Sequence, residues 1–201
     1  MGVGIGKRFI AVVLAGILAL SFSACSQKAD YDVSAYIKGV LDSSYKNAGT
    51  AGNDSDYNDT TTYNAAVRFF DKYAMNASEE QKAAMQAVFK RAYANSRYTV
   101  GAKTEVSYGY DVVVTYDVQT TLQNLEQDIR NRRDEAAKEG KALDVGAEYI
   151  DKVVALCENS VDAANYDGTG TLSFDIRIDE NNDLLLNVNL FDTLDQLILP
   201  V

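Results

Sequence analysis

Two stretches in which every second residue is apolar constrain the fold of this chain most strongly. They run over residues 110–118 and 172–178. Successive side chains of a β-strand point to opposite faces of the sheet. Each stretch therefore predicts a strand with one buried and one solvated face, as antiparallel sheets commonly have. Most other apolar residues recur every three or four positions, the spacing of amphipathic helices. We expect the chain to combine an antiparallel sheet with helices.

Each alternating stretch has a neighbour that completes a β-hairpin. The first is preceded by another alternating run, residues 97–106, with a turn expected at residues 107–109. The second leads through an expected turn at residues 180–182 into a return strand over residues 184–190. Residues 166–170 contain two glycines and are expected to form a turn.

The helical spacing predicts five helices and a short terminal one. Ser78 and Gln81 have the S-x-x-Q form of a capping box, which marks a helix start. Residues 47–62 are rich in Gly, Asn, Asp and Thr and are expected to form a loop, with Thr60 to Thr62 capping the next helix. The expected helices cover residues 32–46, 63–74, 78–95, 121–139, 145–164 and 190–198.

The resulting order is α-α-α-β-β-α-α-β-β-(α), which predicts one α+β domain over residues 31–201. Helices should pack on the apolar face of the sheet, because both must bury their apolar sides. A helix pair followed by a hairpin occurs twice in this order. This recurrence favours two halves that share a four-stranded antiparallel sheet.

The amino terminus has the three parts of an export signal. Lys7 and Arg8 form a short basic region, residues 9–22 carry no charge, and small residues follow up to Cys25. The apolar run has the length of a signal-peptide core and is short for a membrane-spanning helix, which needs roughly 20 residues. The chain turns polar directly after Cys25. An exported protein is therefore expected.

The block Phe22-Ser23-Ala24-Cys25 resembles the bacterial lipobox. The resemblance implies diacylglyceryl transfer to the sulfur of Cys25, cleavage between Ala24 and Cys25, and a protein anchored by lipid to the extracytoplasmic face of the cell membrane. Residues 1–24 would be the signal peptide and residues 25–30 a tether. A plain secretory signal cleaved after Ala24, or an uncleaved anchor helix, remain alternatives.

Charge and histidine content exclude several function classes. The chain has 19 basic and 29 acidic residues, a net charge of −10. Removing residues 1–24 takes away two basic and no acidic residues, which gives −12. An acidic protein is a poor partner for nucleic acid. The chain has no His, which removes Ser-His-Asp and Cys-His catalysis and imidazole metal sites. Cys157 lies on an apolar helical stripe and is expected in the core.

No catalytic residue, cofactor or metal site is expected from the remaining motifs. Residues 179–183 match half of a calcium loop, but Leu184 and Leu190 replace the required Gly and Glu. Residues 53–59 form a denser carboxylate cluster that could bind a cation, although a solvated loop is favoured. The tyrosines on inward stripes are expected in the core or, alternatively, around a groove for a glycan or peptide; they are Tyr36, Tyr63, Tyr73, Tyr93, Tyr98, Tyr110 and Tyr116.

The layout resembles a family of small, uncharacterised lipoproteins of Gram-positive bacteria. The matching motifs are residues 35–46 (AYIKGVLDSSYK), residues 98–100 (YTV) and residues 190–199 (LFDTLDQLIL). The resemblance implies a lipid-anchored domain and brings no catalytic residues. We expect a non-enzymatic binding or envelope-interaction domain, with a small molecule, a glycan or a protein as its ligand. A small carboxylate-dependent envelope hydrolase is the alternative, and a cation-binding module the third hypothesis.

Overall fold

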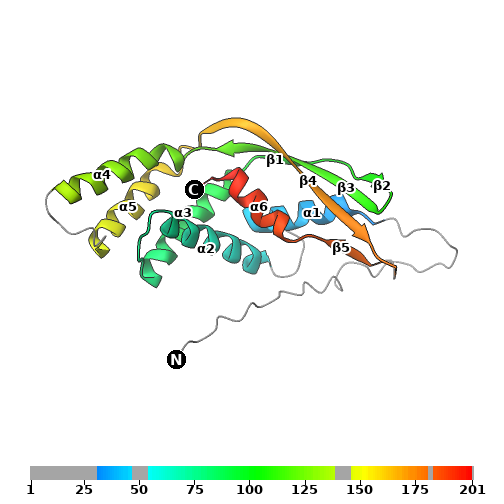
Figure 1. Ribbon diagram of the computed structural model, residues 1–201, viewed down its shortest axis with the longest axis horizontal. Coiled ribbons are helices and arrows are strands. Elements are labelled where there is room, and N and C mark those ends of the chain that lie inside the picture. The colour runs from blue at the N-terminus through cyan, green and yellow to red at the C-terminus, as the bar shows by residue number, and fades with distance from the viewer. Residues whose placement is uncertain (1–30, 47–53, 139–145, 181–182, 201) are drawn as a thin grey trace, which may run out of the picture.

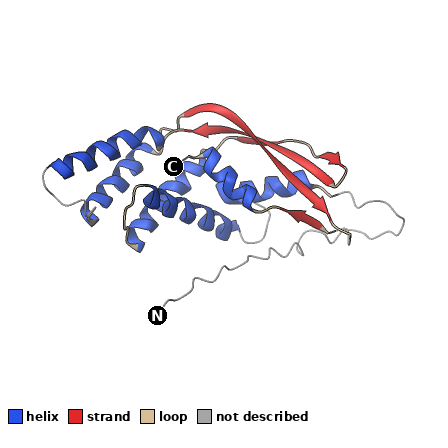
Figure 2. Ribbon diagram, in the orientation of Figure 1, coloured by secondary structure: helices blue, strands red, loops and turns tan. Residues whose placement is uncertain are grey.

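The computed structural model describes residues 31–46, 54–138, 146–180 and 183–200. One layer is a twisted antiparallel sheet, and helices pack beneath it and extend beyond one of its ends (Figures 1 and 2). The expected α+β class and the expected order of helices and strands are confirmed. The signal peptide, Ala24, Cys25 and the tether lie outside the described residues.

The helices are α1 (Val33–Leu41), continued by the π-helical turn η2 (Asp42–Lys46), α2 (Asp54–Lys72), α3 (Glu79–Ala94), α4 (Glu126–Lys138), α5 (Ala147–Ser160) and α6 (Asn189–Ile198), with a 3-10 turn η3 (Gln123–Leu125) before α4. The strands are β1 (Tyr98–Val100), β2 (Thr104–Val106), β3 (Gly109–Gln119), β4 (Tyr166–Ile178) and β5 (Leu184–Leu186).

The two hairpins share one sheet, as the repeated helix-pair-and-hairpin order indicates. The strand order is β1-β3-β4-β5, and β2 also pairs with β3. The long antiparallel pair β3–β4 forms the centre, with Val112 opposite Phe174. Both side chains are fully buried, whereas Val113, the next residue of β3, is exposed. One face of the sheet is therefore packed and the other solvated.

The expected first strand is divided in two by a bulge. Val100 pairs with Val114, and Thr104 pairs with Asp111. Three residues of one strand thus lie opposite two of the other, the mark of a β-bulge. The bulge makes β1 a short edge strand of its own.

The expected turn at residues 166–170 is wrong, because these residues begin β4. The two glycines of this segment instead occupy positions in the strand where a side chain is disfavoured. Gly168 has a φ of +85°, which side-chain-bearing residues rarely adopt. Gly170 lies under the ring of Tyr116, where a Cβ would come within 2.4 Å of the phenol oxygen.

Two other boundaries differ from expectation. The helix expected from residue 63 begins at Asp54, inside the segment expected as a loop. Asn58 and Thr62 are buried there, and the side chain of Asn58 donates to the carbonyl of Ser44 at 2.7 Å. The return strand β5 is short, since the chain turns into helix α6 at Asn189 rather than continuing to residue 190.

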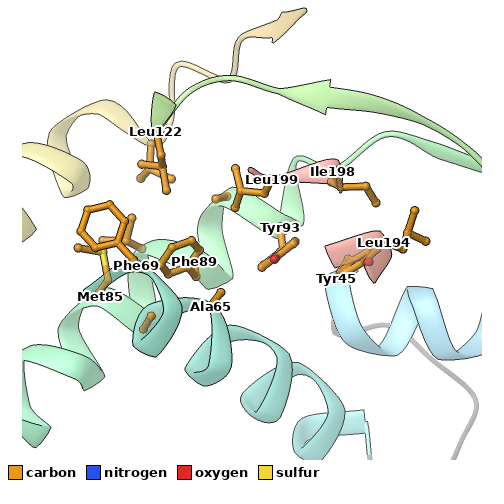
Figure 3. Packing of buried hydrophobic residues seen from close by; sticks show 14 of the residues in the cluster. Tyr45, Ala65, Phe69, Met85, Phe89, Tyr93, Leu122, Leu194, Ile198 and Leu199 are labelled. Carbon is orange, nitrogen blue, oxygen red and sulfur yellow. The ribbon is translucent and has the colours of Figure 1, made fainter. Parts of the chain in front are cut away.

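The core lies between the helices and the packed face of the sheet (Figure 3). Phe69 and Phe89, from the antiparallel pair α2 and α3, contact each other with ring centroids 6.2 Å apart. Leu194 and Ile198 of α6 are fully buried beside Tyr45 and close the core at the carboxyl terminus. Among the described residues, no helix is long and apolar enough to span a membrane.

Candidate functional site

A cleft of about 630 Å³ opens at the sheet edge beside β1. Its volume falls within the range of small-ligand sites, roughly 300–1,000 Å³. The helical segment α1–η2 contributes one part of the lining, and the strands β1 and β3, with the two residues before β1, contribute the rest. Most of the residues that line it have polar or charged side chains; they are Lys38, Asp42, Lys46, Ser96, Arg97, Tyr98, Thr99, Val100, Thr115 and Asp117.

Asp42 joins the helical part of the cleft to β1. Its carboxylate pairs with Lys38 one helical turn away and accepts a hydrogen bond of 2.6 Å from the phenol of Tyr98. Burial, and next this hydrogen bond, raise the pKa of Tyr98 well above its usual value. Tyr98 therefore remains a neutral donor, and the Asp42 carboxylate is held in place by two partners.

Lys46 forms one end of the cleft. Its ammonium group donates to the carbonyls of Ala94 and Ser96, each at 2.6 Å. Ala94 is the last residue of α3 and Ser96 follows its cap, a place where a cation is favoured by the helix dipole. Partial burial lowers the pKa of Lys46, and the charge of Asp42 opposes that shift. Lys46 thus connects η2 to the segment that leads into β1.

Arg97 supplies the most accessible positive charge of the cleft. Its guanidinium lies 3.9 Å from the ring centroid of Tyr166, a cation–π contact that fixes its position. Asp117 is 4.0 Å away, and the Arg97 side chain is 65% exposed. Among the described residues, no group accepts a hydrogen bond from this guanidinium. Its N–H donors remain available to a ligand.

The backbone of β1 also faces the cleft. The amide of Gly101 donates to Val113, and the carbonyl of Arg97 accepts from Asp117. Because alternate residues of a strand turn their peptide groups to opposite edges, Tyr98 and Val100 direct their N–H and C=O groups away from β3. In the part of the chain that the structure describes, no strand pairs with this edge.

A solved structure shares this fold. It is the ycdA protein of Bacillus subtilis, described as a candidate lipoprotein, with a TM-score of 0.58 at 13% sequence identity. The match covers 84% of this chain and 56% of that protein, so this chain spans little more than half of its neighbour's length. At this identity the likeness concerns the fold alone. Neither the protein-family models nor the curated proteins contain a match to the chain.

Cys157 lies in the core, as expected. It is buried on α5 together with Ile150 and Val153, and Val161, which caps the helix, is buried as well. Burial, with a smaller contribution from Glu158, raises the pKa of its thiol to about 12. The thiolate required for nucleophilic chemistry is therefore strongly disfavoured.

Most of the tyrosines on the expected stripes lie in the core, and one of them lines the cleft. The expectation of core positions is confirmed for the buried members Tyr73, Tyr93, Tyr110 and Tyr116. Tyr36 is half-buried, and Tyr63 is exposed. Of the tyrosines on the expected stripes, Tyr98 alone lines the cleft among the described residues. The cleft is accordingly built from charges and backbone rather than from an aromatic groove.

The acidic clusters show no metal-binding arrangement in the described residues. No three Asp, Glu, Cys or His side chains gather there around a common point. Asp179 instead closes the β4–β5 hairpin by accepting from the amide of Asp183 at 2.8 Å. Asp59, from the cluster at residues 53–59, pairs with Lys90 on α3 at 2.5 Å. The cation-binding hypothesis therefore gains no support from these contacts.

A buried polar group that sequence patterns did not single out is Asp195 of α6. Its carboxylate accepts a hydrogen bond of 2.6 Å from Tyr45, and its carbonyl accepts one of 3.2 Å from Tyr93. Burial raises the pKa of Asp195 to about 7, against the opposing effects of the Tyr45 hydrogen bond and the charge of Arg68. Because Asp195 is 150 residues from Tyr45, no local motif could reveal this pair.

Sequence reasoning also did not identify the residues of the cleft as a site. Lys38, Arg97 and Asp117 come from three separate segments that only the fold brings together. The hydrolase alternative retains two candidate acids here, Asp42 and Asp117. Each of them faces a cation, and the hypothesis of a carboxylate-dependent hydrolase stays a prediction.

Proposed function

We propose that this chain is a bacterial lipoprotein, anchored through Cys25 to the extracytoplasmic face of the cell membrane, and that its domain binds a ligand in the cleft beside β1. The export signal and the lipobox-like block at residues 22–25 support the anchor. The fold shared with a protein described as a candidate lipoprotein is consistent with it.

The charge of the cleft is the observation that best supports a binding function. Lys38, Lys46 and Arg97 meet only two carboxylates there, which leaves a local excess of positive charge. The chain as a whole has a net charge of −10. Such a cleft would attract an anionic group where the rest of the surface repels it.

The anchor is tested by mass spectrometry of the native amino terminus. The expected species begins at Cys25 and carries a diacylglyceryl group on sulfur. A Cys25→Ser variant should leave the membrane fraction or retain its signal peptide, since two acyl chains give stable anchoring. An unmodified Cys25 in the native protein, or a cleavage at another position, would refute the lipoprotein assignment.

The binding function is tested by NMR on the full-length chain in detergent micelles. Two probes are titrated separately, free glutamate and a capped acidic heptapeptide, Thr-Glu-Val-Thr-Val-Glu-Thr. At least one should shift the amide signals of residues 96–100 and lose affinity in an Arg97→Gln variant. A matched Lys152→Gln variant, at an exposed position of α5 away from the cleft, should bind as the wild type does. The absence of cleft shifts with both probes contradicts the function.

A further inference from the structure

We propose that the cleft beside β1 binds an extended acidic peptide by strand addition, so that the peptide becomes an additional strand at this edge of the sheet. This inference rests on the proposed binding function and names the class of its ligand. Its basis is the free backbone edge of β1 between two groups of positive charge.

The edge of β1 is accessible in its middle and secured at both ends. The hydroxyl of Ser34 donates to the carbonyl of Gly101 at 3.0 Å, and Lys46 donates to the carbonyl of Ser96. These two contacts fix the ends of the strand to α1 and η2. Tyr98 and Val100 lie between them, and their outward N–H and C=O groups offer two donors and two acceptors.

An unpaired strand edge is a template for another chain. Proteins commonly block such edges with a proline, a bulge or a covering loop. Here the bulge follows β1 rather than interrupting it, and Thr99 and Val100 carry no charge. The contacts of α1–η2 keep the strand in an extended, preorganised form, which lowers the entropy cost of binding. Strand addition is an established mode of peptide recognition that uses such an edge.

The charges around the edge specify an acidic peptide. Lys38 and Arg97 are both well exposed, with 61% and 65% of their side chains accessible. Side chains of an added strand that alternate along its length would place carboxylates near these cations. The nearby Asp42 and Asp117 would repel a second pair of acids, so we expect one or two acidic residues rather than a long acidic run.

The experiment compares four peptides in their binding to the full-length chain in detergent micelles. The first is the acidic heptapeptide above, and the second carries Lys in place of Glu. The third and fourth are the acidic peptide N-methylated at every second amide, each starting from a different one of the first two amides. Fluorescence anisotropy measures each affinity. The acidic peptide should bind at least about tenfold more tightly than the Lys peptide, and one N-methylated form should lose about tenfold, the effect of removing one or two hydrogen bonds.

The backbone contact is tested independently by hydrogen exchange. In the free protein, the amides of Tyr98 and Val100 should exchange quickly, whereas that of Thr99 is protected by its pairing with β3. Saturation with the acidic peptide should slow the exchange of Tyr98 and Val100 and leave Thr99 unchanged. A Val100→Pro variant removes one outward donor and should weaken binding about tenfold.

The outcomes separate this inference from the proposed function. Binding that shifts the cleft signals but is insensitive to N-methylation, and leaves the two amides unprotected, overturns strand addition while the cleft remains a binding site. The same holds if free glutamate alone binds. If neither probe binds, both proposals fall. The N-methylated peptides keep the test decisive should Val100→Pro fail to fold.

Discussion

Asp195 is the residue whose environment departs most from that of an ordinary surface carboxyl. It lies in the core beside Tyr45, and burial raises its pKa to about 7. An unfolded aspartate has a pKa of about 3.9. The folded protein therefore holds a proton that the unfolded chain releases, so the contribution of this group to stability is full below about pH 4 and is lost as the pH rises to about 7.

An Asp195→Asn variant should abolish this pH dependence. Asn keeps an oxygen that can accept the Tyr45 hydrogen bond but cannot ionise. The difference in unfolding free energy between the variant and the wild type should grow by about 3 kcal/mol in favour of the variant between pH 4 and pH 7.5. Urea denaturation at both pH values measures it. A difference independent of pH would show that Asp195 titrates in the folded protein as it does in the unfolded chain.

Gly109 lies where the neighbouring strand leaves no room for a side chain. A Cβ at this position would lie 2.0 Å from the backbone carbonyl oxygen of Ile176 in β4. Gly109→Ala should therefore destabilise the protein by about 2–4 kcal/mol, because strands at the centre of the sheet must move apart. Gly168 provides the comparison, since a Cβ there meets no atom within 4 Å.

Gly168→Ala should cost only about 1 kcal/mol, the penalty of its φ of +85°. Thermal or urea unfolding of both variants gives the two values. Equal losses would mean that the close approach of β3 and β4 is relieved without cost. Because β3 and β4 would separate, the amides of β4 should also exchange faster in Gly109→Ala.

At the scale of elements, the start of α3 is a complete capping box. The hydroxyl of Ser78 accepts from the amide of Gln81 at 3.2 Å, and the Gln81 side chain accepts from the amide of Ser78 at 3.0 Å. Ser78→Ala should cost about 1 kcal/mol, since it leaves a helix amide without its partner. Ser107→Ala, in the exposed turn before β3, should change the unfolding free energy by less than about 0.5 kcal/mol. Urea midpoints compare the two; equal effects would contradict the capping role.

The capping box also shows which elements sequence reasoning can locate. Its pattern is local, as is the alternation over residues 110–118, and the structure confirms both. The start of α2 is different, because Asn58 and Thr62 resemble loop residues. Both are buried, and the side chain of Asn58 donates to the carbonyl of Ser44, a contact between two elements. Local composition carries no information about such a partner.

The candidate site also depends on contacts between elements rather than on local patterns. The charged residues Lys38 and Arg97 look like ordinary surface positions in the sequence. Their meaning depends on the free edge of β1, which exists because, in the part of the chain that the structure describes, β1 pairs with β3 alone. Sequence alternation predicted a strand here but not which of its edges would stay unpaired. The cleft is thus a property of strand pairing rather than of any motif.

At the scale of the whole molecule, α6 connects elements that lie far apart in the chain. It contacts β3 and β4 of the sheet, and its Asp195 bonds to Tyr45 at the end of η2. Phe191 of α6 packs against Phe174 of β4, with ring centroids 5.0 Å apart. The amino-terminal helices and the sheet therefore share part of their core with the last helix of the chain.

This arrangement predicts that helices and sheet unfold together when α6 is weakened. Leu194 is fully buried, and Leu194→Ala should cost about 2–5 kcal/mol through the lost contacts and the cavity. Leu197 on the same helix is 37% exposed, so Leu197→Ala should cost less than about 1 kcal/mol. Far-ultraviolet circular dichroism reports the helices, and hydrogen exchange of Val112 and Phe174 reports the sheet. Both probes should show the same reduced stability in Leu194→Ala, because one cooperative unit responds as a whole. A loss confined to α1 and α6, with the central strands still protected as in the wild type, would instead mean that the sheet is stable without its carboxyl-terminal helix.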